Sequence, residues 1–161
     1  MPATDTERHT ITRKDLAKKL NEDLSREYQA IIAYVVYSQA LKGAEYMNIA
    51  RELEVHAGEE LQHAIAIAKQ IDYLGEMPTA ETLPVVLSED PETMLRADLE
   101  NENQTIRNYR ERVRQCEDLG EYACAEVIRE ILKQEQEHQI DLATALGEDV
   151  PDVADLAGAK H

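Results

Sequence analysis

The sequence contains no tryptophan and no phenylalanine, and its seven tyrosines are its only aromatic residues. Leu, Ile, Val and Ala must therefore fill the interior, and small aliphatic side chains suit closely packed helices. Alternating runs of β-branched residues are scarce and there are only six glycines, so strands are poorly indicated. These absences, together with long stretches rich in Ala, Leu, Glu, Gln, Lys and Arg, predict an all-α protein.

Basic residues are few, with 17 Lys and Arg against 33 Asp and Glu, which gives a formal net charge of −16. Such a surface repels phosphate backbones, so nucleic acid is not expected as a partner. The most apolar run, residues 30–41, is too short to span a bilayer, and no membrane partner is expected. Two cysteines and the polar start MPATDTERHT disfavour a secreted disulfide scaffold, so a cytoplasmic location is expected.

Capping residues and helix breakers predict four helices. Thr12 and Asp15 have the spacing of a capping box. Asp90 precedes Pro91, which is typical of an N-cap followed by proline at the first helical position. The predicted helices cover residues 13–42, 45–74, 91–118 and 121–146.

The connections between these helices predict the topology. Short turns at Gly43 and at Leu119–Gly120 make each hairpin antiparallel, whereas the proline-rich segment 75–91 is long enough to run the length of a bundle. We therefore expect one domain, a four-helix bundle of two antiparallel helical hairpins joined by a long crossover. The bundle covers residues 13–147, with a flexible N-terminal segment at 1–12 and a short C-terminal tail at 148–161.

The chain also repeats itself without a gap when it is shifted by 75 residues. The two halves are then expected to be related by a pseudo-two-fold axis through the bundle, so that matched residues face each other across it. The matches pair Leu24 with Leu99, Glu27 with Glu102, Tyr34 with Tyr109, Glu60 with Glu135, and His63 with His138.

Two Glu-x-x-His motifs carry the chemistry. Glu60 with His63, and Glu135 with His138, each place a carboxylate and an imidazole on one helix face. The remaining carboxylate of each half is Glu27 or Glu102. Glu27 and Glu60 lie at nearly equal distances along the chain from Gly43, and Glu102 and Glu135 from the second turn, so each pair sits at the same height in its hairpin. The six residues therefore form one candidate metal set.

Charge balance favours two divalent ions at this set. Four carboxylates and two imidazoles inside a bundle would be severely destabilising without partners, and two such ions would neutralise the four carboxylates. Carboxylate and imidazole ligands suit iron or manganese, and zinc competes. A single Glu-x-x-His is usually a solvated surface pair, but two copies in register with the repeat predict a site.

The neighbours of these residues add candidates. Tyr34 lies two turns after Glu27 on the same face and is the candidate catalytic side chain, as a hydrogen-bond donor to a ligand or as an electron donor. The alternative is a core tyrosine with a satisfied hydroxyl. His56 and Glu59 lie within one turn of Glu60 and form either a secondary cation site or a solvated polar face.

The two cysteines flank the second hairpin turn symmetrically. Cys116 and Cys124 are either structural thiols or a redox-responsive pair. They lie roughly four helical turns from the candidate metal set, too far along the helix axis to be ligands.

In the six candidate residues, in Leu24 and Tyr34, and in the segments 94–102 and 131–138, the chain resembles the ferritin-like superfamily and most closely the bacterioferritin type of di-iron site. The resemblance covers about residues 13–146. It implies two iron ions per subunit and a ferroxidase that oxidises Fe²⁺ with O₂ or H₂O₂. It also implies a homo-oligomer that stores ferric iron in a hollow shell.

Two departures from the bacterioferritin pattern affect these expectations. The position after the second-helix Glu, where bacterioferritin carries a haem-ligating Met, is Leu61, so no haem is predicted. Only about 14 residues follow Gly147, without helical apolar periodicity. That length resembles Dps-like proteins that combine a bacterioferritin-type site with a 12-subunit shell. A 12-mer is therefore favoured over a 24-mer, and a dimer remains open.

Two other functions stay open from the sequence. A rubrerythrin-like, peroxide-reducing di-iron enzyme without a storage shell would use the same six residues, although no CxxC rubredoxin module is present. A non-catalytic helical bundle would bind no metal.

Overall fold

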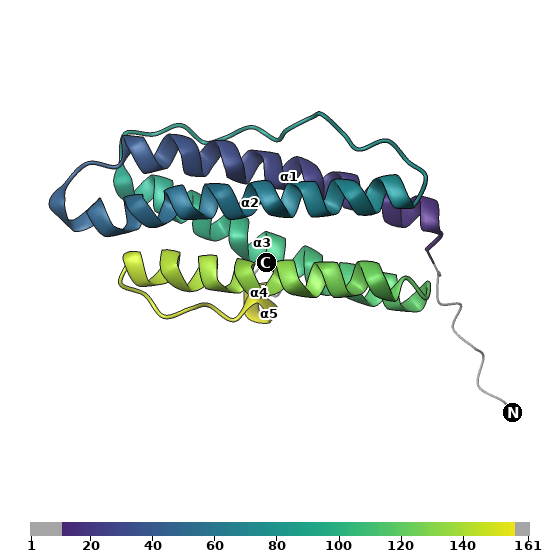
Figure 1. Ribbon diagram of the computed structural model, residues 1–161. Helices are drawn as coiled ribbons and strands as arrows, with labels where there is room; N and C mark the ends of the chain where they lie inside the picture. The colour runs from purple at the N-terminus through teal and green to yellow at the C-terminus, as the bar shows by residue number, and fades with distance from the viewer. Residues whose placement is uncertain (1–10, 157–161) are drawn as a thin grey trace, which may run out of the picture.

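The computed structural model describes residues 11–156 and confirms the all-α four-helix bundle. Two antiparallel hairpins lie side by side in Figure 1, with α1 packed mainly against α2 and α3 mainly against α4. The predicted flexible segment at 1–12 falls almost entirely outside the described residues. The long helices are α1 (Arg13–Ala40), α2 (Met47–Tyr73), α3 (Pro91–Asp118) and α4 (Tyr122–Ala145).

The helix starts follow the predicted caps. The Thr12 hydroxyl accepts a hydrogen bond from the Asp15 amide at 3.1 Å, and the Asp15 carboxylate accepts one from the Thr12 amide at 2.9 Å. This reciprocal capping box begins α1. Asp90 caps α3 by accepting a hydrogen bond from the Thr93 amide at 2.9 Å. Both helices therefore begin where local side-chain chemistry satisfies free backbone amides.

The first hairpin turn and the C-terminal segment differ from the predictions. Helix α1 ends at Ala40 rather than at residue 42, and a single 3-10 turn, η1 (Ala44–Tyr46), precedes α2. The predicted tail contains a four-residue helix, α5 (Val153–Leu156), which packs against α3. The side chain of Val153 is buried there, although the segment lacks helical apolar periodicity.

The crossover between α2 and α3 runs along α1, as the upper loop of Figure 1 shows. Hydrogen bonds fix it at intervals: Asn21 donates to the Met77 carbonyl at 3.1 Å, and Gln29 donates to the Pro84 carbonyl at 2.7 Å. These carbonyls have no backbone donor within the extended segment, so side-chain amides of α1 supply the donors. The crossover thereby returns the chain to the opposite end of the bundle, which makes α2 and α3 parallel.

The apolar core consists of two clusters separated along the bundle axis. On α1, the first cluster includes Leu16 and Leu24, and the second includes Ala33 and Tyr37. Buried Glu27 lies between them in sequence, so a layer of buried charged groups divides the interior.

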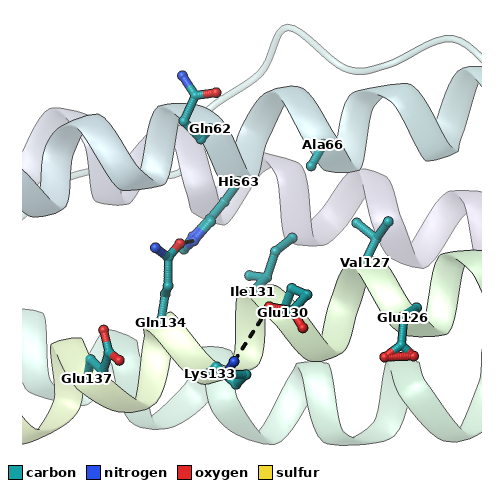
Figure 2. Close-up of a pocket in the computed structure, with 10 residues that line it drawn as sticks. All are labelled: Gln62, His63, Ala66, Glu126, Val127, Glu130, Ile131, Lys133, Gln134 and Glu137. Carbon is teal, nitrogen blue, oxygen red and sulfur yellow. Dashed lines mark hydrogen bonds and ion pairs between the residues drawn. The ribbon is translucent and has the colours of Figure 1, made fainter.

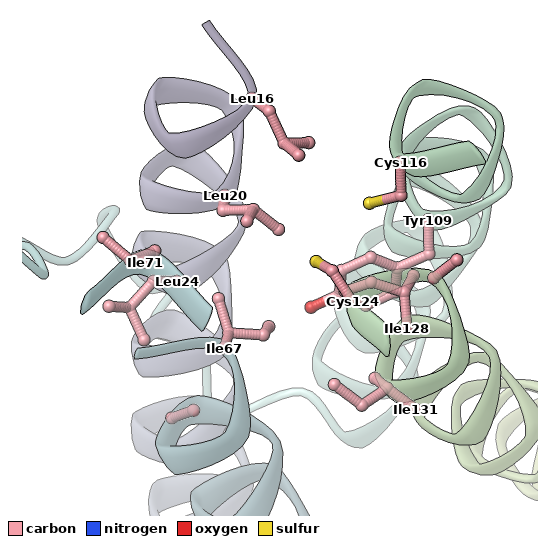
Figure 3. Packing of buried hydrophobic residues seen from close by; sticks show 12 residues of the cluster. Leu16, Leu20, Leu24, Ile67, Ile71, Tyr109, Cys116, Cys124, Ile128 and Ile131 are labelled. Carbon is pink, nitrogen blue, oxygen red and sulfur yellow. The ribbon is translucent and has the colours of Figure 1, made fainter. Parts of the chain in front are cut away.

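The two cysteines belong to the first cluster, which Figure 3 shows. Cys116 on α3 and Cys124 on α4 are both free and buried. They pack among Leu16, Leu20 and Ile128. Within the described residues, no helix combines the length and the apolar character needed to cross a membrane.

Candidate metal centre

The structure brings all six predicted residues into the polar layer between the two clusters. The helices contribute to it symmetrically: α1 and α3 provide one Glu each, and α2 and α4 provide a Glu and a His each, one turn apart. Every one of the six side chains is buried, with at most 3% of the residue surface exposed. The residues are Glu27, Glu60, His63, Glu102, Glu135 and His138.

Two overlapping groups of four donors can be drawn within this layer. In each group the potential ligand atoms all lie within 4.8 Å of one another. Glu60 and Glu135 belong to both groups, so each would be placed to donate to two ions. The first group adds Glu27 and His63, and the second adds Glu102 and His138.

The histidines both turn Nδ1 toward the carboxylates. His63 Nδ1 lies 3.0 Å from Glu60 Oε2 and 3.2 Å from Glu135 Oε1. His138 Nδ1 lies 2.9 Å from Glu60 Oε1 and 3.2 Å from Glu135 Oε2. The two half-sites therefore have nearly the same geometry, as the sequence repeat requires.

The outer nitrogens of the same rings contact Gln134, which the sequence did not indicate, and Glu59, which it indicated only as a neighbour of Glu60. His63 Nε2 lies 2.5 Å from Gln134 Oε1, and Figure 2 shows the two side chains pointing toward each other between α2 and α4. His138 Nε2 lies 2.6 Å from Glu59 Oε2. Such contacts fix the tautomer and leave Nδ1 free for a metal. Glu59 and Gln134 are themselves 75 residues apart, so the repeat could have identified them as a pair.

Each tyrosine of the predicted pair donates to the Glu of the other half. The Tyr34 hydroxyl bonds Oε1 of Glu102, and the Tyr109 hydroxyl bonds Oε1 of Glu27. The candidate catalytic Tyr34 therefore contacts a predicted ligand across the pseudo-two-fold axis. This contact would orient the carboxylate of Glu102.

The electrostatics of the centre are those of crowded, buried acids and bases. Burial and the charges of Glu135 and Glu27 raise the pKa of Glu60 well above its usual value. Burial and the charges of Glu102 and Glu27 raise the pKa of Glu135 to about 8. Burial lowers the pKa of both histidines, but hydrogen bonds to the surrounding carboxylates outweigh it and raise them. Without a cation, these raised pKa values favour bound protons on Glu60, Glu135 and the two histidines, which reduces the repulsion among the carboxylates.

Three carboxylate oxygens test whether the residues fit a metal. Oε2 of Glu27, Oε2 of Glu102 and Oε2 of Glu135 are buried and have no hydrogen-bond partner. In Glu27 and Glu102, this is the free oxygen of a carboxylate whose Oε1 atom a tyrosine binds. Buried carboxylate oxygens without a partner are strongly unfavourable, and a cation at each group would satisfy them. The donor set therefore fits two hard or borderline metal ions.

One large pocket and one small internal space border the centre. A pocket of about 610 Å³ opens between α2 and α4 and is lined by His63, Ala66, Ile131 and Gln134 (Figure 2). Between α1 and α3, a space of about 10 Å³ lies among the four predicted glutamates. That volume holds about one water molecule.

The other residues considered near the centre, His56, Glu59 and Leu61, have different surroundings. The Glu59 carboxylate contacts Nε2 of His138, and His56 is grouped with Glu52 and Asp141 rather than with Glu59. His56 Nε2 lies 3.0 Å from Oδ2 of Asp141 on α4, a residue to which no sequence pattern pointed. Leu61, at the position of the bacterioferritin haem ligand, is exposed on α2.

Comparisons with known proteins agree with this architecture. A family model described as a ferritin-like domain matches residues 17–149. A bacterioferritin from Brucella melitensis is 27% identical over 139 residues, covering 82% of this chain and 86% of that protein. A bacterioferritin from Desulfovibrio desulfuricans is 28% identical over 120 residues, covering 74% and 67%.

Solved structures are similar as well. A ferritin-like di-iron-carboxylate protein from Bacillus anthracis superimposes with a TM-score of 0.80 at 30% identity, covering 83% of this chain and 96% of that one. A dodecameric, bacterioferritin-related thioferritin from Bacteroides fragilis superimposes with a TM-score of 0.79 at 26% identity, covering 94% and 93%.

Proposed function

The chain belongs to the ferritin-like domain family, and from this premise we propose that it is a ferroxidase. It binds two iron ions within each subunit and oxidises Fe²⁺ with O₂ or H₂O₂. The observation that carries the proposal is that Glu60 and Glu135 both belong to each of the two groups of four donors. Glu27 and His63 would complete the ligands of one ion. Glu102 and His138 would complete those of the other.

The protein's own contribution is geometry and charge. Glu59 and Gln134 hold the outer nitrogens of the two histidines, so that Nδ1 of each ring faces the ions. Tyr34 and Tyr109 hold one oxygen of each terminal carboxylate and leave the other free. When bound, iron supplies the redox chemistry, because Fe²⁺ gives up an electron to an oxygen-derived oxidant. Manganese and zinc are the alternative occupants.

The test is oxygen uptake after Fe²⁺ is added to the purified full chain. Glu60→Ala and Glu135→Ala should each abolish Fe²⁺-dependent uptake, since each variant removes an oxygen donor from both ions. The matched control is Glu54→Ala with Glu137→Ala, which removes two exposed acids from the same helices and should leave uptake unchanged. Uptake at the wild-type rate in either single variant would contradict the site. Measuring the rate of Fe³⁺ formation by its absorbance, with O₂ alone and with H₂O₂ under nitrogen, identifies the preferred oxidant.

We also propose that the chain forms a homo-oligomer of twelve subunits that stores the oxidised iron. The dodecameric Bacteroides fragilis protein supports this number. Exposed apolar side chains on the α1–α2 hairpin, among them Ile32, Val35, Leu61 and Ile65, are available for contact with a second copy. Twelve chains of 18.2 kDa give about 218 kDa, which light scattering separates from a dimer near 36 kDa. A dimer would instead favour a peroxide-reducing enzyme without storage.

A further inference from the structure

The two halves of the centre differ in their surroundings, although their six central residues match. Polar and acidic side chains surround His138. The residues that match them by the 75-residue repeat surround His63, and these are apolar or neutral. The pairs are Glu52 with Val127, His56 with Ile131, Glu59 with Gln134, and Asp141 with Ala66.

Three of these polar residues converge outside the six-residue centre. His56 Nε2 lies 3.0 Å from Asp141 Oδ2, and Glu52 brings a further carboxylate to them. One donor atom from each of the three residues lies within 4.8 Å of the others. Two carboxylate oxygens this close repel each other unless a proton or a cation lies between them. A histidine with two carboxylates is a suitable donor set for a divalent transition metal.

The histidine of this cluster is built into the fold. His56 is only 2% exposed, and its Nδ1 is buried without a hydrogen-bond partner. The corresponding position in the other half holds buried Ile131, so the bundle can be packed there without a polar group. A solvated polar face would not need a buried imidazole. Packing therefore does not explain why a histidine is buried at this position, whereas binding of a ligand would.

The cluster connects the surface with the di-metal centre. Glu52 and Asp141 line a hollow of about 260 Å³ between α2 and α4. On its inner side, the His56 ring stacks on the His138 ring with centroids 4.0 Å apart and planes 27° apart. A cation that enters the hollow would first reach the carboxylates of Glu52 and Asp141. Only the His56 ring would then separate it from the His138 ring.

We propose that Glu52, His56 and Asp141 form a third cation site, which holds a divalent transition metal beside the His138 half of the centre. Binding at this site does not depend on the proposed function. Only the identification of the natural cation as Fe²⁺ rests on it. At the matched positions beside His63, Val127, Ile131 and Ala66 offer no donor atoms. The third site would therefore lie beside one half of the centre only.

The direct test is a crystal structure of the full chain soaked anaerobically in Co²⁺, with anomalous difference maps. The proposal predicts a peak in contact with Glu52, His56 and Asp141, in addition to two peaks among the six central residues. Two central peaks with none at the third position would overturn the inference and leave the ferroxidase proposal intact. A third peak without central peaks would support the inference and contradict the proposed function. An absence of all peaks would refute both.

Solution binding provides the second measurement. Glu52→Gln with Asp141→Asn should reduce Co²⁺ binding by one ion per chain, or weaken that ion at least roughly tenfold, while the central ions still bind. The matched control is Glu126→Gln with Glu130→Gln, which removes two exposed acids from the pocket at the His63 end. The control should bind as many ions as wild type. Equal stoichiometry and affinity in both double variants would overturn the third site.

Discussion

The hydroxyl of Tyr34 donates a hydrogen bond to Oε1 of Glu102, a residue of the opposite half of the chain. The repeat-related contact, from Tyr109 to Glu27, runs in the other direction. Each half of the duplicated chain therefore orients a carboxylate of the other. This exchange ties the two hairpins together at the level of the metal centre.

The first prediction concerns this exchange. Tyr34→Phe should weaken Co²⁺ binding by roughly tenfold or more, because Glu102 loses the donor that orients it. Titration followed by the visible absorption of Co²⁺ measures the affinity. Tyr37→Phe is the matched control, since the Tyr37 hydroxyl donates to the Val86 carbonyl of the crossover. If both variants bind Co²⁺ with wild-type affinity, Tyr34 is a core tyrosine and not a positioning residue.

The second prediction concerns a buried ion pair. Arg112 of α3 donates to both oxygens of Asp23 of α1, at 2.6 and 3.0 Å, and both side chains are buried. Arg112→Leu should lower the free energy of unfolding by about 3–5 kcal/mol, because it leaves a buried carboxylate without a partner. Urea unfolding measures the change. Adding Asp23→Asn should recover part of the loss, whereas Arg110→Leu, at an exposed position, should have little effect.

The third prediction concerns pH and Asp98, which is related to Asp23 by the repeat. At the position of Arg112 the first half has Tyr37, and Oδ2 of Asp98 is buried without a partner. Burial, with the charge of Glu102, raises the pKa of Asp98 well above its usual value. A raised pKa contributes stability below the ordinary pKa of 3.8, and this contribution is lost as the pH rises toward the folded-state value.

Asp98→Asn should therefore be close to wild type in stability near pH 4 and more stable at neutral pH. The gain is on the order of 1–3 kcal/mol, since the variant no longer confines an ionisable acid in the core. Thermal unfolding of metal-free protein across this pH range measures it. Asp72→Asn, at an exposed position, serves as the control. A stability difference that stays constant with pH would show that Asp98 does not titrate as described.

The fourth prediction concerns metal loading. The pKa values of both histidines and of Glu60 and Glu135 are raised in the metal-free centre, so a cation must displace protons from these groups. Affinity for Co²⁺ should therefore fall as the pH is lowered from about 8 to about 6, by roughly tenfold per pH unit for each proton displaced. Calorimetry in two buffers of different ionisation enthalpy counts the protons. A pH-independent affinity would contradict the description of the centre.

Much of the fold could be predicted because its signals are local. Thr12 and Asp90 mark helix starts through side chains that bond the first amides, and glycines follow three of the helix ends. The turn at Gly43 was less predictable. There the chain leaves α1 in an extended conformation at Leu41 and inserts a 3-10 turn, which has no side-chain cap and no buried residue to indicate it.

The candidate site was predictable to the extent that it is repeated. The three-residue spacing within each Glu-x-x-His motif shows that the Glu and the His share a helix face. The equal distances of the glutamates from the hairpin turns show that they lie at the same level along the bundle axis. The partners of the outer nitrogens and of Tyr34 depend on how the helices rotate against each other, which helix periodicity does not fix. Asp141 belongs to the same case, because it meets His56 only through the packing of α4 on α2.

Two iron ions that share Glu60 and Glu135 must lie close enough for their spins to couple. Mössbauer spectroscopy tests this most directly, on full-length protein loaded anaerobically with two Fe²⁺ per chain and then exposed to air. We expect both ions to be retained and to become a magnetically coupled ferric pair, and Glu60→Ala to lose the coupling. Iron that stays unbound, or that is oxidised as isolated, uncoupled ferric ions in the wild-type protein, would contradict it.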